Sequence, residues 1–244
     1  MFDSLNQVHT WSKSIQVALS LTNTFTLDKL IVERVTELVR SKFSSMEGSH
    51  DWFHIQRVLK MSLHLQNIEG GNKEVVQLSA LLHDISDHKY NGGDFEKGKE
   101  EAYNIIINEG GTKKLAHSVG LIIPQVSFKG ALVDDEDMSI EGLIVRDADR
   151  LDAIGAMGIA RAFAYGGSRN RPLYNPDVKP MNHTSKEEYL NSKSHTINHF
   201  YEKLLLLKDR MHTETAKKIA AHRQEIMMNY LEEFYAEWNV EIKD

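Results

Sequence analysis

The sequence predicts an all-α fold, with a many-helix core and an additional pair of helices at its C-terminal end. Apolar residues recur at steps of three and four along most of the chain, which is the spacing of one face of an α-helix, whereas alternating strand patterns are scarce. Only 4 prolines interrupt these patterns, and 41% of the residues are hydrophobic, as in an ordinary globular protein. At 244 residues, the chain is long enough to bury a substantial core.

The first four predicted helices each combine an apolar stripe with a signal for where the helix ends. In the second of them, Val58, Met61 and Leu65 lie on one stripe, and Gly70-Gly71 ends the helix. The fourth closes at Gly110-Gly111, which is typical of a glycine C-cap. These helices are expected at residues 27–43, 50–68, 74–85 and 96–109.

The second half of the chain is predicted to add four helices around one irregular stretch. Pro124 indicates an end or a kink in the first of them, and Gly166-Gly167 opens a segment that also contains three prolines. We expect this segment, residues 164–185, to be a long loop, and such loops are often functional. The four helices are expected at residues 113–125, 139–163, 187–211 and 215–238.

These elements suggest a division of the chain into three parts. We expect an N-terminal extension over residues 1–26, a core that carries the functional site over residues 27–185, and C-terminal helices over residues 186–244 that pack on the core. The apolar side of the last helix is explained equally well by pairing within the chain or across a homodimer.

Charge and composition exclude several classes of function. The 29 basic and 35 acidic residues give a net charge of -6, which argues against a nucleic-acid polymer as the main partner but is compatible with a small phosphorylated substrate. The chain has no cysteine, so a metal would be bound by imidazole and carboxylate groups, and 12 histidines are available. Because no leader and no long apolar span is present, we expect a cytoplasmic protein that is not bound to a membrane.

The dipeptide His83-Asp84 lies in the apolar segment Leu81-Leu82-His83-Asp84-Ile85. A buried carboxylate costs several kcal/mol unless a cation compensates it, and a divalent metal is one such cation. His54 is a second candidate ligand because it shares the apolar stripe of its helix. A solvated helix end and a hydrogen-bonded core histidine are the structural alternatives, and His50 offers a local pair with His54 one turn away.

Three aspartates, Asp147, Asp149 and Asp152, interrupt the apolar helix expected at residues 139–163. The first two lie about 200° apart around a helix, so they cannot both face one site. Periodicity alone does not choose between Asp147 and Asp149, and a solvated or salt-bridged helix face would explain either.

In this order and context, the motifs resemble the HD-domain metal-dependent phosphohydrolase superfamily, and in particular the bacterial branch that includes the YpgQ and YedJ proteins. The motifs that carry the resemblance are Ser49-His50-Asp51-x-x-His54, Leu82-His83-Asp84 and Asp147-Ala148-Asp149-Arg150-Leu151-Asp152. The resemblance covers residues 28–238 and implies an all-α HD-domain core. It also implies that the metal ligands are His54, His83, Asp84 and Asp149, because the last aspartate of the family precedes a basic residue and a further x-Asp.

The implied ligand set of two imidazoles and two carboxylates suits one divalent ion per chain. Mn²⁺ is the expected ion, and Mg²⁺, Fe²⁺, Co²⁺, Ni²⁺ and Zn²⁺ are alternatives. An ion in such a site lowers the pKa of a bound water and polarises a phosphoryl group. The resemblance therefore implies hydrolysis of small nucleotides, in particular of (deoxy)nucleoside triphosphates with release of pyrophosphate.

The resemblance also suggests residues around the metal. Asp87 occupies the place of an acidic residue that assists the water in related hydrolases, and we expect it to act as a general base or to orient the water. His88 and His117 are either further donors near the site or surface histidines. A helix-terminal carboxylate is the alternative for Asp87.

Phosphate groups need cations or backbone N–H donors. Lys129 and Arg150 are preferred because their flanks resemble those of the family, and Gly166-Gly167 is expected to belong to a substrate-recognition loop in which Tyr165 or Tyr174 stacks on a base. The six candidate cations are Lys89, Lys129, Arg150, Arg161, Arg169 and Arg171.

Three alternative functions follow from the same residues. A phosphomonoesterase or a cyclic-nucleotide phosphodiesterase would use the same site and release different products. A nucleotide-sensing HD protein would keep the fold without catalysis. An oxygenase with two irons would need further histidine ligands between His83-Asp84 and Asp149, and His88 and His117 lie in that interval.

Overall fold

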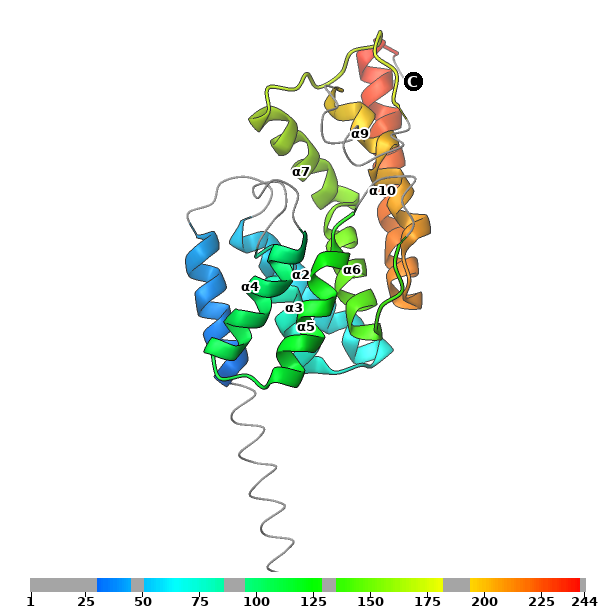
Figure 1. Ribbon diagram of the computed structural model, residues 1–244. Coiled ribbons are helices and arrows are strands. Elements are labelled where there is room, and N and C mark those ends of the chain that lie inside the picture. The colour runs from blue at the N-terminus through cyan, green and yellow to red at the C-terminus, as the bar shows by residue number, and fades with distance from the viewer. Residues whose placement is uncertain (1–29, 45–50, 86–94, 129–134, 182–193, 242–244) are drawn as a thin grey trace, which may run out of the picture.

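The computed structural model describes residues 30–44, 51–85, 95–128, 135–181 and 194–241, and this part of the chain is helical and contains no strand (Figure 1). The predicted all-α fold is therefore confirmed. The helices in chain order are residues 30–43, α2 (Trp52–Glu69), α3 (Lys73–Leu82), α4 (Phe95–Asn108), α5 (Lys113–Val126), α6 (Ile140–Asp152), α7 (Gly155–Ser168), α9 (Thr196–Glu202), the 3-10 helix η1 (Leu204–Arg210) and α10 (Glu214–Trp238).

Side-chain caps define where several of these helices begin. Asp51 accepts a hydrogen bond from the backbone N–H of His54, and Asn72, Thr112 and Thr213 cap α3, α5 and α10 in the same way. Each cap satisfies a backbone donor that has no partner within its helix, which contributes about 1 kcal/mol. The cap at Asp51 also fixes the first turn of α2, from which His54 projects.

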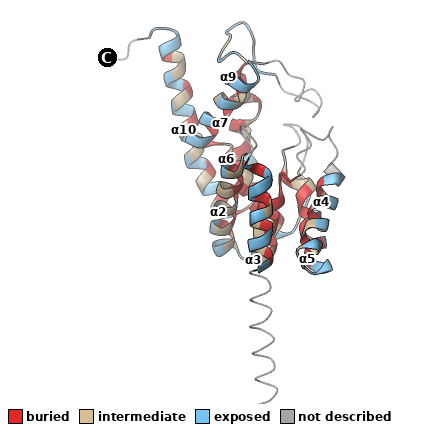
Figure 2. Ribbon diagram, turned by 90° about the vertical axis from the view of Figure 1, so that its left-hand side faces the viewer, coloured by how far each residue is buried: buried red, intermediate tan, exposed pale blue. Residues whose placement is uncertain are grey.

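Helix α2 packs against α3 and α6, α4 pairs with α5, and α10 runs along α7, α6 and α2. The buried residues lie on the inner faces of the helices and the exposed ones on the outer faces (Figure 2). Val58, Leu65, Leu81, Ile144 and Leu151 belong to one continuous buried cluster. The apolar side of α10 is thus covered within the chain, at its contacts with these helices.

The helix predicted over residues 139–163 is in fact two helices. The first, α6, ends at Asp152; Ile154 is extended, and Gly155 has a φ of 74° at the start of α7. A side chain at Gly155 would also meet Arg223, since an added Cβ lies 2.9 Å from Arg223 Cγ. The glycine therefore allows both the left-handed backbone and the close approach of α10.

The prediction for residues 164–211 was wrong in two respects. Helix α7 continues to Ser168, through Gly166-Gly167, because Gly166 packs directly against Thr196 at the start of α9 and does not break the helix. The long helix predicted over residues 187–211 is replaced, in its described part, by α9 and η1, which meet at Lys203. Residues 182–193 lie outside the described residues, as do the predicted domain boundary within them and the predicted extension over residues 1–26.

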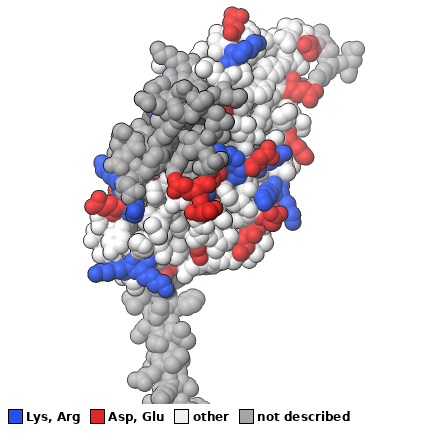
Figure 3. Space-filling view, turned by 45° about the vertical axis from the view of Figure 1, so that its right-hand side comes forward, with Lys and Arg blue, Asp and Glu red and all other residues white. Residues whose placement is uncertain are grey.

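Two surface properties bear on the partners. On the face shown in Figure 3, the Lys and Arg side chains of the described residues are interspersed with Asp and Glu and do not form a broad basic surface. Among the described helices, none is both long and apolar enough to cross a membrane.

Candidate metal centre

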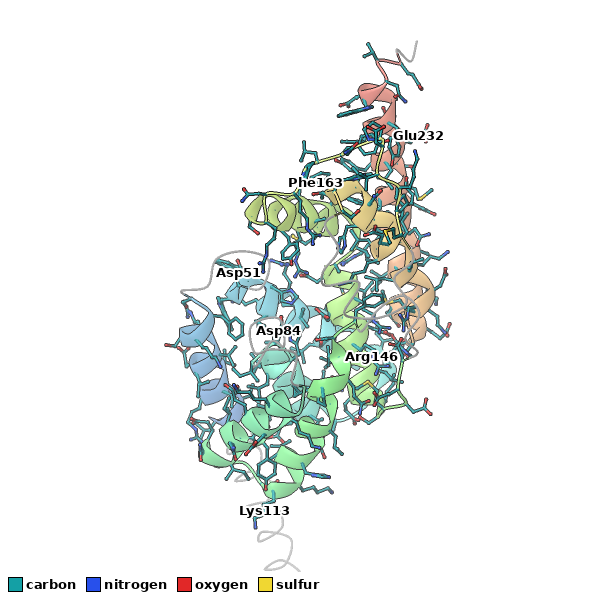
Figure 4. All side chains as sticks on the ribbon, turned by 45° about the horizontal axis from the view of Figure 1, so that its top comes forward. Asp51, Asp84, Lys113, Arg146, Phe163 and Glu232 are labelled. Carbon is teal, nitrogen blue, oxygen red and sulfur yellow. The ribbon has the colours of Figure 1, made fainter. Side chains whose placement is uncertain are left out.

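Four side chains from three helical segments converge in the interior of the molecule. His54 comes from α2, His83 and Asp84 directly follow α3, and Asp149 comes from the last turns of α6. The two histidine Nε2 atoms lie 3.2 Å apart. Asp84 Oδ2 is 3.4 Å and 3.5 Å from the Nε2 atoms of His54 and His83, and Asp149 Oδ1 is 3.5 Å and 3.8 Å from them. Figure 4 shows Asp84 in the middle of the helical body.

The hydrogen bonds of the two imidazoles show which atoms point at the centre. His83 Nδ1 lies 2.8 Å from the carbonyl oxygen of Ala80, and His54 Nδ1 lies 2.7 Å from Asp152 Oδ2. Both partners are acceptors, so each Nδ1 carries the hydrogen in the neutral ring and each Nε2 presents a lone pair. Two lone pairs 3.2 Å apart, flanked by two carboxylates, are stabilised by a cation between them.

The separations also fit a shared ion. Atoms bound about 2.0–2.2 Å from one metal stand roughly 2.8–3.6 Å apart when they are neighbours in its coordination shell. The measured separations of 3.2–3.8 Å lie within this range or slightly above it. The ligand atoms of His54, His83 and Asp149 all lie within 4.8 Å of one another, which is close enough for one ion to bind all three.

Burial makes the centre asymmetric. His54, His83 and Asp84 are buried, whereas the Asp149 side chain keeps 25% of its surface exposed. The side of the centre next to Asp149 is therefore open to solvent. The side formed by His54 and His83 is inaccessible to solvent, so a substrate would approach from the side of Asp149.

Asp152 contacts the candidate ligand His54, a role that the sequence analysis did not assign to it. Its carboxylate accepts hydrogen bonds from His54 Nδ1, from Arg57 Nε and Nη2 at 2.7 Å and 3.0 Å, and from Arg161 Nη1 at 2.7 Å. Burial would raise the pKa of Asp152, but the hydrogen bonds from His54 and Arg57 outweigh it and hold this pKa well below its usual value. Because Asp152 follows Asp149 by three residues, its position on the same helical face was a usable signal.

The carboxylates also act on His54. Burial lowers the pKa of His54, but the hydrogen bonds to Asp152 and Asp84 outweigh it, and the net effect is a raised pKa. The negative charge that favours a proton on this ring equally favours a metal ion at Nε2. A carboxylate behind a metal-binding histidine commonly fixes the ring orientation and strengthens the ligand.

The structure separates the roles of Asp147 and Asp149. Asp147 is fully buried and accepts hydrogen bonds from the backbone N–H groups of His212 and Thr213 and from the Thr213 hydroxyl. It therefore anchors the start of α10, and its carboxylate is directed at His212 and Thr213 instead of at His54 and His83. Of these two aspartates, Asp149 is the one whose carboxylate lies next to the Nε2 atoms of His54 and His83.

Arg150, predicted to bind phosphate, has another role in the structure. Its guanidinium is buried and forms two hydrogen bonds with Asp135, at 2.8 Å and 2.5 Å, and one with the carbonyl oxygen of Arg210 at 2.6 Å. These bonds tie α6 to the segment before it and to η1. These donors are used within the fold, which argues against the predicted contact of Arg150 with phosphate.

The other predicted cations differ in position. Arg161 contacts Asp152 and so lies on the Nδ1 side of the candidate ligand His54. Arg169 and Arg171 lie at the end of α7, with their guanidinium carbons 5.5 Å and 5.7 Å from the centre of the Tyr165 ring. Figure 1 shows that α7 starts next to the end of α6 and runs away from it. The end of α7 that carries Arg169 is therefore separated from α6 by the length of α7.

Several predicted residues lie outside the described part of the chain. These are His50, Asp87, His88, Lys89 and Lys129. His117 is described and is exposed on α5, so it is not part of the metal centre.

Comparison with known proteins agrees with this geometry. The HD domain family model matches residues 52–154. The YpgQ protein of Bacillus subtilis is 34% identical over 201 residues, which cover 82% of this chain and 89% of YpgQ.

Solved structures show the same similarity. A protein from Lactobacillus plantarum superposes with a TM-score of 0.78 at 34% identity, covering 86% of this chain and 98% of that one. An HD-superfamily hydrolase from Bacillus thuringiensis superposes with a TM-score of 0.68 at 36% identity, covering 87% and 98%. The structure of YpgQ in complex with ADP superposes with a TM-score of 0.68 at 32% identity, covering 86% and 96%.

Proposed function

The chain belongs to the HD domain family and is a metal-dependent hydrolase of that superfamily, and we propose that its substrates are (deoxy)nucleoside triphosphates. In the proposed reaction, water attacks the α-phosphorus, the bond from this phosphorus to the bridging oxygen breaks, and pyrophosphate leaves. The nucleoside monophosphate is the second product.

One observation carries the hydrolytic assignment: both imidazoles present their Nε2 lone pairs to one point, 3.2 Å apart, between two carboxylates. His54, His83, Asp84 and Asp149 would hold the ion, and we propose Mn²⁺, because mixed imidazole and carboxylate ligands suit it. A bound divalent ion polarises a phosphoryl group and lowers the pKa of water. The buried histidines exclude solvent from the floor of the site, and the exposed side at Asp149 admits the phosphates.

Two further roles are proposed from the resemblance. Asp87 would take the proton from the attacking water, since the acidic residue at this place does so in related hydrolases. Lys89 and Lys129 would contact the phosphates. All three lie outside the described residues.

The nucleotide is supported by two findings. YpgQ, a relative of this chain, was crystallised with ADP. In this chain, Arg169 and Arg171 flank the Tyr165 ring at the end of α7. Guanidinium groups bind phosphate oxygens in pairs of hydrogen bonds, so these two arginines suit a phosphorylated ligand.

The test is a panel of substrates with product identification. The protein loaded with Mn²⁺ is assayed with ribo- and deoxynucleoside triphosphates, nucleoside monophosphates and cyclic nucleotides, and pyrophosphate and orthophosphate are quantified separately. We expect pyrophosphate from triphosphates, and no turnover by the His83→Ala variant. Orthophosphate from monophosphates would instead show a phosphomonoesterase, cleavage of cyclic nucleotides a phosphodiesterase, and binding without turnover a sensor.

A further inference from the structure

A second cavity lies behind the metal centre, between α2, α6, α7 and α10. Its volume is about 300 Å³, and four of the eight residues that line it are basic, beside one carboxylate and the apolar side chains of Met61, Ala148 and Met157. None of the four metal ligands lines it. Asp152 separates the two sites, because its carboxylate contacts His54 at Nδ1 whereas the metal centre lies on the Nε2 side of the same ring. The basic residues and the carboxylate are Arg57, Lys60, His64, Arg223 and Asp152.

The charges lining this cavity do not balance. Arg57, Lys60 and Arg223 carry three positive charges, and Asp152 is the one acidic residue that lines the cavity. Both oxygens of Asp152 are already used by His54, Arg57 and Arg161. Among the described residues, Lys60 has no hydrogen-bond or ion-pair partner, so its charge is left to solvent or to a ligand.

Two of the cations are held in place by the fold. Arg57 is fixed by its two hydrogen bonds with Asp152. Arg223 donates from Nη1 to the carbonyl oxygen of Leu151, and its side chain packs against Gly155, where the missing side chain makes room for it. Each guanidinium therefore keeps further N–H donors in a fixed orientation, which lowers the entropy cost of binding an anion.

The electrostatics of Arg223 agree with this geometry. Burial lowers the pKa of the Arg223 guanidinium, and the negative charge of Asp152 offsets this effect only in part. A guanidinium that is half-buried with so little compensating charge is stabilised by an added anion. Lys60 and His64, both exposed at the rim, supply donors that can close over it.

We propose that this cavity is a second binding site, separate from the metal centre, for a phosphoryl anion such as inorganic phosphate or pyrophosphate. Two guanidinium groups, one ammonium group and one imidazole match the several oxygens of such an anion, because guanidinium groups bind phosphate oxygens in pairs of hydrogen bonds. The proposal rests on the lining of the cavity and holds whether or not nucleotides are the substrate of the metal centre.

The test measures pyrophosphate binding to the full chain by isothermal titration calorimetry after metal removal with a chelator, so that the metal centre cannot bind the anion through an ion. Lys60→Glu removes a cation from the cavity without disturbing a described contact. Lys113→Glu makes the same charge change on an exposed residue at the far end of the molecule, which Figure 4 shows, and is the matched control.

We expect the metal-free wild-type protein to bind one pyrophosphate per chain, Lys60→Glu to bind it at least 10-fold more weakly, and Lys113→Glu to bind it within 2-fold of wild type. Phosphate should compete for the same site. Absence of binding to the metal-free protein would overturn the proposal, and so would equal affinities of the two lysine variants.

Discussion

Replacing Asp152 by asparagine tests whether the carboxylate behind His54 controls metal affinity. The carboxylate accepts one hydrogen bond from His54, two from Arg57 and one from Arg161, and the substitution removes its charge and turns one acceptor oxygen into a donor NH₂ group. That group faces donors, so the His54 ring loses its fixed orientation or its partner. Loss of such a contact behind a metal-binding histidine typically costs 10–100-fold in metal affinity, which is about 1.4–2.7 kcal/mol.

The assay is Mn²⁺ binding measured by competition with a chelating dye at a temperature where every variant is folded. Asp147→Asn is the matched control, because it also removes a buried carboxylate from α6. The Asp147 carboxylate binds the start of α10 and does not contact His54. We expect Asp152→Asn to bind Mn²⁺ 10–100-fold more weakly and Asp147→Asn to bind it within about 2-fold of wild type. If Asp152→Asn retained wild-type affinity, or if both variants lost it equally, the reasoning about Asp152 would be refuted.

Three further predictions concern stability. Gly155→Ala should lower the free energy of unfolding by at least about 1–2 kcal/mol in urea titrations, because Gly155 combines a φ of 74° with the contact to Arg223. Gly70→Ala is the control: Gly70 has a φ of 86° but open space around it, so this substitution should lower the free energy of unfolding by less. Burial would raise the pKa of Asp135, but Arg150 lowers it to about 2, so the advantage in stability of wild type over Asp135→Asn should be largest above pH 5 and should shrink as the pH falls through 3.8 towards 2. A difference in stability that does not change with pH would contradict this. Chelation should lower the melting temperature and added Mn²⁺ restore it, whereas a melting temperature unaffected by Mn²⁺ would argue against a structural contribution of the ion.

The residues that sequence reasoning placed best are those whose position follows from local periodicity. His54 shares its stripe with Val58 and Leu65, so its inward orientation could be predicted and is observed. The pair His83-Asp84 could be recognised because it ends an apolar helix, and both side chains are buried. The all-α fold followed from the same periodicity.

The open alternatives and the errors arose where distant segments decide the outcome. Helix α6 is buried on two sides, so Asp147 and Asp149 both look inward-facing, and their roles depend on α10 and on the histidines respectively. Arg150 was predicted to bind phosphate because its flanks resemble those of the family, and its partner in the structure, Asp135, cannot be identified from the local pattern. The break at Gly155 likewise depends on Arg223, which belongs to a helix that follows much later in the chain.

The most direct test of the metal centre is the Mn²⁺ content of the purified protein after dialysis, measured by mass spectrometry for wild type and for Asp149→Ala. Asp149 lies at the exposed side of the centre, so its removal takes away a ligand with little effect on the buried core. We expect one ion per chain in wild type and a large loss in the variant. One ion per chain retained in Asp149→Ala, or none bound by wild type, would contradict the assignment of the centre.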